Sequence, residues 1–344
     1  MNPLVTVLLG LGLILGLSAC SSAAGPSHTP TPDAQAIQKR IFDATGDVPA
    51  HDPTILREGS TYYRFTTGVG IPISCSPDLV TWTHCSRVFL AKPGWLLKAV
   101  PGVGDLWAPD VIKMNGKYYL YYSASTFGSN LSVIALATNT TLDPDSPDYK
   151  WVDEGEVVKS SFKDNFNAID PNIVLDAKQQ PWLAYGSYWS GIKLRKLDPQ
   201  TGKPPEGGNE VLSIASRPPD PHAIEAAFIL PKDGEYFLFV SFDQCCQGVA
   251  STYNIRVGRS KEITGPYLDR DGKKMTEGGG SLVLDGKERW RGPGHSSVLV
   301  DEGKYYLVYH AYDTQKGGQP TLRVEEFMWD DQGWPVAPSH LVGK

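Results

Sequence analysis

Short apolar segments alternate with polar turns along most of the chain. Five aromatic-rich segments recur, and each follows a turn that is itself preceded by a shorter apolar stretch. The aromatic segments lie near Tyr62, Tyr118, Trp182, Tyr236 and Tyr305. The shorter stretches are "PTIL", "DVIKM", "PNIVL", "AAFIL" and "SSVLV". The pattern predicts a strand, a tight turn and a second strand, repeated about every 55–70 residues.

Further strand-like segments, such as "LSVIALAT", "GIKLRKLD" and "YNIRVGRS", fill the gaps between these pairs. About four strands per unit in five units predict an all-β fold, a five-bladed β-propeller, which we place at residues 36–344. A jelly roll or a large sandwich is the alternative, but neither accounts for five similar units.

In a propeller the first strand of each blade lines the central axis, so the residues that begin these strands converge. Counting back from the apolar residues predicts the following positions: Asp52, Pro109, Asp170, Glu225 and His295. Asp110 lies one position later, where its side chain faces the other way, and we expect it to be a structural hydrogen-bonding residue. Carboxylates that meet repel one another and shift their pKa values, a cost tolerated mainly where chemistry needs it.

Composition and net charge limit the classes of partner that the protein is expected to bind. Hydrophobic residues make up 41% of the 344 residues, enough for a sizeable core. The net charge is −6 and no basic run occurs, which argues against nucleic acid but not against a neutral polysaccharide. The 16 tyrosines and 9 tryptophans could stack on sugars, although most are expected in the core. Two carboxyl groups roughly 6.5–9.5 Å apart would suit inverting glycoside hydrolysis, in which one donates a proton and the other activates water.

The first residues form a separate segment. The apolar run that ends in Leu17-Ser18-Ala19-Cys20 predicts a lipoprotein signal peptide at 1–19, with a lipid on Cys20, and an ordinary secretory signal is the alternative. Residues 20–35 are predicted to be a disordered Ser/Pro-rich tether. Either signal implies export. Ser21 after Cys20 favours an outer-membrane lipoprotein, with the lipid as the only membrane contact; otherwise the protein is secreted.

Export permits disulfides among the four remaining cysteines. Cys75 and Cys85 could close a hairpin-sized loop. The adjacent Cys245 and Cys246 could be a strained disulfide or two reduced thiols. No His/Cys spacing typical of zinc occurs.

Several motifs together carry a family resemblance. They are "HDPTI", "LWAPDV", "NAIDPN", "YGSYWSGI", "IEAAFI", "CCQG", "STYNIRVGRS", "TGPY", "GGGS" and "GPGHSSV". From about Asp47 to His310 the chain resembles glycoside hydrolase family 43, and most closely its endo-α-1,5-L-arabinanase branch. The resemblance implies a monomeric enzyme that acts on arabinan, a plant cell-wall polysaccharide.

The resemblance also implies roles for the acids. Asp52 would be the general base, Glu225 the general acid, and Asp170 would modulate the pKa of the donor. His295 matches a histidine near a bound metal, usually Ca²⁺ with water ligands; the alternative is a histidine that hydrogen-bonds the central carboxylates. Candidate subsite residues are Trp107, Phe127, Asn167, Ser187 and Tyr188, for each of which packing or a turn hydrogen bond is the alternative.

Other activities remain open. An exo-arabinanase, an α-L-arabinofuranosidase or a β-xylosidase could use the same scaffold. Loops 91–104 and 199–222 are predicted to gate the groove and so to decide between endo and exo action. A non-catalytic glycan-binding surface lipoprotein is the alternative of a different class, but it would not need three acids at the blade heads.

Overall fold

The computed structural model describes residues 34–208, 210–219 and 222–342. The predicted signal peptide, Cys20 and nearly all of the predicted tether lie outside these residues. The first described element, α1 (Ala34–Gln38), begins two residues before the predicted start of the domain, and Ile37 within it is buried. No helix in the described part of the chain is long and apolar enough to cross a membrane.

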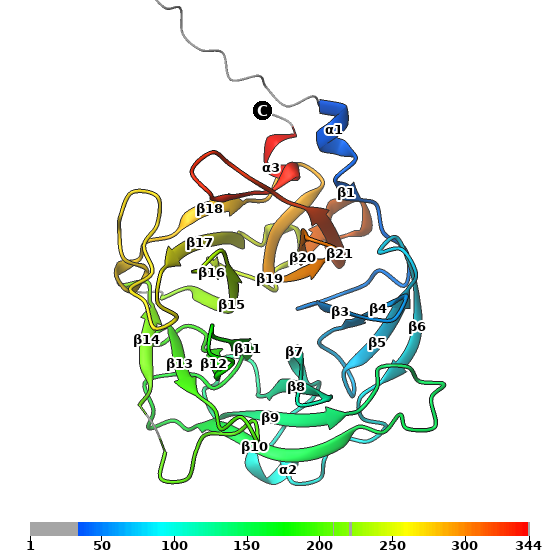
Figure 1. Cartoon of the computed structure of the whole chain (residues 1–344), viewed down its shortest axis with the longest axis vertical. Coiled ribbons are helices and arrows are strands. Elements are labelled where there is room, and N and C mark those ends of the chain that lie inside the picture. Colours follow the sequence, from blue (N-terminus) through cyan, green and yellow to red (C-terminus); the bar gives the residue numbers. More distant parts are fainter. Residues whose placement is uncertain (1–33, 209, 220–221, 343–344) are drawn as a thin grey trace, which may run out of the picture. The chain divides into compact units, whose positions relative to one another are not determined.

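Five antiparallel sheets surround a centre, as Figure 1 shows, and confirm the predicted five-bladed propeller. The innermost strands are β3 (Thr54–Glu58), β7 (Trp107–Met114), β11 (Asn172–Leu175), β15 (Ile224–Lys232) and β19 (Trp290–Asp301). The aromatic segments form the second strands: β4 (Thr61–Phe65), β8 (Lys117–Ala124), β12 (Pro181–Tyr185), β16 (Glu235–Phe242) and β20 (Lys304–Asp313).

The outer strands complete each blade. They are β5 (Pro72–Ser76), β6 (Thr81–Arg87), β9 (Ser132–Asn139), β10 (Val152–Ser160), β13 (Ile192–Lys196), β14 (Leu212–Ala215), β17 (Asn254–Ser260), β18 (Ser281–Leu284) and β21 (Gln319–Glu326). Short β2 (Thr45–Gly46) pairs in parallel with β6. The remaining elements are α2 (Leu96–Ala99), β22 (Met328–Trp329), β23 (Pro335–Val336), α3 (Pro338–Leu341) and three 3₁₀ turns at Gly248–Ala250, Met275–Glu277 and Thr314–Lys316.

A strand from the start of the domain closes the ring. In β1 (Ile41–Phe42), Ile41 pairs with Glu325 and Phe42 with Val324 of β21, so the last blade takes its outermost strand from the N-terminal side. This pairing covers the β21 edge and ties the two ends of the propeller together.

Apolar side chains fill the spaces between neighbouring blades. Phe65 of β4 and Tyr122 of β8, for example, belong to one cluster between the first two blades. Most aromatics of the repeats are core residues, as expected, and Tyr118, Tyr121, Tyr122 and Tyr185 are almost fully buried. Cys75 and Cys85, whose pairing the sequence left open, form a disulfide that links β5 to β6.

The innermost strands share a left-handed residue near their start, and this position corrects the predicted register. These residues are Asp52 (φ 51°), Ala108 (φ 47°), Asp170 (φ 57°), Ala226 (φ 57°) and His295 (φ 47°). In β7 the left-handed residue precedes Pro109 and in β15 it follows Glu225, and the pairings of both strands shift register there as in a β-bulge. Glu225 lines the central cavity as predicted, whereas Pro109 does not. Apolar pairs such as Val111–Ile112 and Phe228–Ile229 do not show which register a strand takes.

Asp110 has the structural role predicted for it. It is 6% exposed, and its carboxylate accepts hydrogen bonds from Thr54 Oγ1 at 3.3 Å, Asn172 Nδ2 at 2.9 Å and the Ile173 amide at 2.8 Å. These donors come from the blades on both sides. Asp110 thus ties three innermost strands together.

Candidate functional site

A cavity of about 990 Å³ opens at the beginning of the innermost strands. All nine site residues predicted within the described chain line it: Asp52, Trp107, Phe127, Asn167, Asp170, Ser187, Tyr188, Glu225 and His295. The two loops predicted to gate the groove contribute little to the lining of this cavity. No residue of 91–104 lines the cavity, because Leu96, Val100 and Val103 pack into the core between the first two blades. Of the described part of 199–222, only His222 lines it.

Asp52 is held as a charged carboxylate. Its side chain is buried and accepts hydrogen bonds at Oδ2 from Thr67 Oγ1 at 2.5 Å and at Oδ1 from His51 Nδ1 at 2.8 Å. His295 Nδ1 lies 3.1 Å from the same Oδ1. Burial alone would raise the pKa of Asp52, but the neighbouring histidines, His51 first, outweigh it and hold that pKa well below its usual value.

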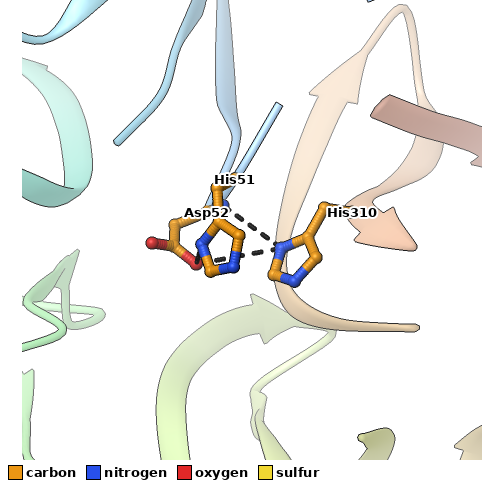
Figure 2. Close-up of side chains that lie close together, drawn as sticks. All are labelled: His51, Asp52 and His310. Atoms are coloured by element: carbon orange, nitrogen blue, oxygen red, sulfur yellow. Dashed lines mark hydrogen bonds and ion pairs between the residues drawn. The ribbon is translucent and has the colours of Figure 1, made fainter. Parts of the chain in front are cut away.

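Two further histidines, which the sequence analysis did not single out, lie against the Asp52 carboxylate. Figure 2 shows the rings of His51 and His310 beside Asp52; the rings stack with centroids 4.1 Å apart. The Asp52 amide donates to His310 Nδ1 at 3.2 Å. His310 is fully buried, and burial holds its pKa well below the usual value, so its ring is a neutral acceptor under Asp52. Burial also lowers the pKa of His51, but the charge of Asp52 and their hydrogen bond raise it overall.

The environment of Glu225 raises the pKa of its carboxyl group, whereas that of Asp52 lowers it. Its buried carboxyl accepts hydrogen bonds at Oε2 from Ser187 Oγ at 2.6 Å and at Oε1 from the Tyr253 hydroxyl at 2.7 Å. Burial raises the pKa of Glu225, and the two hydrogen bonds offset only part of this rise. Ser187, predicted to be a subsite residue, is thus a partner of the carboxyl predicted to be the acid.

Asp170 forms a hydrogen bond to the backbone next to Glu225. Its Oδ2 accepts the Ala226 amide at 3.1 Å, one residue beyond Glu225, and its own amide donates to Ser123 Oγ at 3.0 Å. Burial, and then the charges of Glu225 and Asp52, raise the pKa of Asp170 well above its usual value. Because Asp170 and Glu225 repel each other when both are charged, the pair retains a proton that a single exposed carboxyl would lose.

The remaining predicted residues form the walls. Phe127 is 83% exposed at the rim, as expected of a stacking surface rather than of core packing. Asn167 Nδ2 donates to the Ser129 carbonyl at 3.2 Å, and its buried Oδ1 has no protein partner. Tyr188 is left-handed at φ 51° and Trp107 is half-buried. An unpaired amide oxygen next to aromatic faces suits a ligand rich in hydroxyl groups.

The residues around His295 do not form a calcium cage. Ca²⁺ prefers six to eight oxygen ligands, whereas His295 contributes a ring nitrogen and its Nδ1 faces Asp52. Among the described residues, the group of ligand atoms that lies close enough to share an ion is His51, Asp52 and His310, which contains two imidazoles and already makes internal hydrogen bonds. We therefore assign no step to a metal.

Several residues of the site escaped the sequence analysis. Thr67 and His310 contact the carboxylate predicted to be the base, but each sits in a segment without a distinctive pattern. Tyr253 contacts Glu225 and lies in the motif "STYNIRVGRS", which carried the family resemblance but gave Tyr253 no role. His51 had a usable signal, because it directly precedes Asp52. The open question about Cys245 and Cys246 is answered, because they form a disulfide on the cavity wall.

Comparisons with known proteins agree with this geometry. The family model for "Glycosyl hydrolases family 43" matches residues 46–335. An extracellular exo-α-(1→5)-L-arabinofuranosidase of Cellvibrio japonicus is 46% identical over 299 residues, 84% of this chain and 86% of the relative. An extracellular endo-α-(1→5)-L-arabinanase of Bacillus subtilis is 43% identical over 326 residues, 93% and 96% of the two chains.

The structural similarity is equally extensive. A Cellvibrio cellulosa α-L-arabinanase, solved in complex with arabinohexaose, superimposes with a TM-score of 0.83 at 43% identity and covers 87% of this chain and 98% of its own. The family model spans all five innermost strands and every residue that lines the cavity. The chain therefore belongs to glycosyl hydrolases family 43.

Proposed function

We propose that this enzyme hydrolyses α-1,5-linked L-arabinofuranosyl bonds inside arabinan chains, with inversion at the anomeric carbon. One observation carries the proposal: a single open cavity contains two carboxyl groups whose environments push their pKa values apart. Asp52 is stabilised in its charged form and Glu225 in its protonated form. Such a pair is what an acid-base hydrolysis of a glycosidic bond requires.

In the proposed reaction Glu225 protonates the leaving glycosidic oxygen. Asp52 removes a proton from a water molecule as that water attacks the anomeric carbon from the opposite face, and the bond to the leaving sugar breaks. Ser187 and Tyr253 hold the Glu225 carboxyl from both oxygens, while Thr67 and His51 do the same for Asp52. Mutual repulsion between Asp170 and Glu225 retains one proton on this pair of carboxyl groups.

Endo action follows from the open form of the cavity. Its walls include exposed Phe127 on one side and the segment Gln244–Gln247 on another, and its volume of about 990 Å³ exceeds that needed for one sugar. The B. subtilis relative named as an endo-arabinanase supports this mode. The C. japonicus relative, named as an exo enzyme and 46% identical, supports exo action on the same substrate as the second candidate.

A product profile separates these candidates. The purified protein is incubated separately with linear arabinan, branched arabinan and arabinoxylan, and products are sized over time. We expect mixed arabino-oligosaccharides from linear arabinan at early times. A single short product from the first minutes would instead establish exo action, and products from arabinoxylan alone would overturn the assignment of arabinan.

The stereochemistry can be read in the same reaction. Proton NMR of the first products should show the β-anomer of the new reducing end before mutarotation, as inversion of an α-linkage requires. An initial α-anomer would contradict the proposed roles of Asp52 and Glu225.

The protein is exported, in agreement with the two relatives named as extracellular. We further propose that it is an outer-membrane lipoprotein anchored through Cys20, on the strength of the Leu-Ser-Ala-Cys sequence alone. Replacement of Cys20 by alanine should then move the activity from the membrane fraction to the soluble exported fraction. Activity that is soluble already in the wild type would favour an ordinary secretory signal.

A further inference from the structure

The disulfide between Cys245 and Cys246 lies beside the predicted base rather than in the core. Both cysteines line the cavity, and Cys246 is exposed. Cys246 Sγ lies 3.8 Å from His51 Nε2. The Cys246 amide donates a hydrogen bond to the Tyr312 hydroxyl at 2.7 Å, and that hydroxyl lies 3.2 Å from the same His51 nitrogen.

These contacts lead directly to the reacting carboxylate. His51 Nδ1 is the nitrogen that contacts Asp52 Oδ1 at 2.8 Å, so the two nitrogens of one ring are held by Asp52 on one side and by Tyr312 with Cys246 on the other. His310 stacks on one face of the same ring. The position of the His51 ring therefore depends on where the backbone of Cys246 stands.

The same loop also reaches the predicted acid. The Gln244 carbonyl accepts hydrogen bonds from the amides of Thr252 at 3.0 Å and Tyr253 at 3.2 Å, which closes the loop over residues 244–253. The Tyr253 hydroxyl at its far end donates to Glu225.

The backbone at Cys246 is left-handed, with φ 64°. A residue with a Cβ atom rarely adopts this conformation unless something holds it there. A covalent ring that joins two neighbouring side chains restricts the peptide between them. When the ring opens, Cys246 can leave this region, and its amide and sulfur then move away from Tyr312 and His51.

We infer that the Cys245–Cys246 disulfide positions His51 against Asp52, so that reduction of this one bond slows hydrolysis without unfolding the propeller. The inference rests on the proposed function for its kinetic part. Reduction by a dithiol transfers two electrons and two protons to the bond: the S–S bond breaks, Cys245 and Cys246 become thiols, and the dithiol closes to its own disulfide.

The chain offers a matched control. The second disulfide, Cys75–Cys85, links β5 to β6, and neither cysteine lines the cavity. The wild type, Cys245→Ala/Cys246→Ala and Cys75→Ala/Cys85→Ala are assayed on linear arabinan with and without dithiothreitol. Alkylation and mass spectrometry of the peptides confirm which bond is open, and the melting temperature confirms that the protein stays folded.

We expect kcat of the wild type and of Cys75→Ala/Cys85→Ala to fall about tenfold on reduction, with KM changed less than about twofold, since a displaced base slows the chemical step. Cys245→Ala/Cys246→Ala should have the low kcat from the start and not respond to dithiothreitol. Unchanged kcat after complete opening of the Cys245–Cys246 bond would overturn the inference. So would a loss confined to KM, which would make the disulfide a sugar contact instead.

A measurement independent of activity separates this inference from the proposed function. The ring signals of His51 in NMR spectra, assigned with His51→Gln, should move on reduction of the wild type but stay in place in Cys245→Ala/Cys246→Ala. If they move while no arabinan is cleaved, the positioning stands and the proposed substrate is wrong. If they stay in place in the wild type, the positioning is wrong.

Discussion

The Tyr253 hydroxyl donates a hydrogen bond of 2.7 Å to Oε1 of Glu225, the carboxyl proposed to protonate the leaving group. Tyr253 is 2% exposed, and burial together with the charge of Glu225 raises its pKa well above the usual value, so the hydroxyl stays protonated and remains a donor. The proposed acid therefore has a fixed orientation and is largely buried, and its protonation depends on a small number of nearby groups that can be changed one at a time.

Glu225→Gln should lower kcat/KM on linear arabinan by about 10³-fold, since a positioned general acid contributes roughly 10²–10⁴. The loss should be much smaller on a 4-nitrophenyl arabino-oligosaccharide, whose leaving group needs no proton. Asp52→Asn is the matched comparison. It should lower kcat/KM on both substrates by similar factors, because the hydrolysis of each needs an activated water. Equal losses of Glu225→Gln on the two substrates would contradict the assignment of the acid.

Tyr253→Phe should shift the alkaline limb of the pH profile of kcat/KM upward by about one pH unit. The hydrogen bond from Tyr253 lowers the pKa of Glu225. Its removal lets that pKa rise, so the protonated donor persists to higher pH, and one neutral hydrogen bond is worth about one pKa unit. The profile is measured from about pH 4 to 9. A shift of the alkaline limb to lower pH would contradict this prediction.

Asp170→Asn should move the same alkaline limb in the opposite direction. The like charge of Asp170 disfavours the ionised form of Glu225, so a neutral amide allows Glu225 to lose its proton at lower pH. The two variants form a pair with opposite signs on one readout. An alkaline limb that stays in place in Asp170→Asn would show that Asp170 binds substrate without tuning the donor.

Asp110→Ala should cost stability rather than chemistry. Its carboxylate is the acceptor for three buried donors from two neighbouring blades, and their loss should lower the free energy of unfolding by about 3 kcal/mol. Asp110→Asn, which keeps one acceptor oxygen, should lose less. Urea unfolding checks the stability, and kcat per folded molecule at low temperature should remain within about threefold of wild type in both variants.

Chelation tests the predicted calcium ion. An ion held by one ring nitrogen of His295 and by water would bind weakly, so exhaustive EDTA treatment should change the melting temperature by less than about 2 °C. The activity on linear arabinan should likewise change little after EDTA treatment. A larger drop that is restored by Ca²⁺ but not by Mg²⁺, and that is absent in His295→Ala, would instead establish a resident ion on the axis.

The sequence by itself determined the repeat, the number of blades and nine of the residues that line the cavity. Each of these features depends on residues that are close together in the sequence. A turn between two apolar strands recurs five times, and Asp52 and Asp170 each precede a proline and a buried strand. Repeated local signals specify a propeller because each unit needs a neighbour to cover its apolar faces. The prediction for loop 91–104 was wrong, because its apolar residues pack in the core.

The tertiary structure alone decided which residues surround each acid. His310 comes from β20, far along the chain, and only ring closure brings it to Asp52. Tyr253 directly precedes β17 and reaches Glu225 of β15 across the same blade. The bulges that turn Ala108 and Ala226 into the left-handed positions are likewise invisible in an apolar pair such as Val111–Ile112. Periodicity specifies which face of a strand is buried. The direction of one carboxyl, and with it the pKa, depends on contacts between blades that no local pattern encodes.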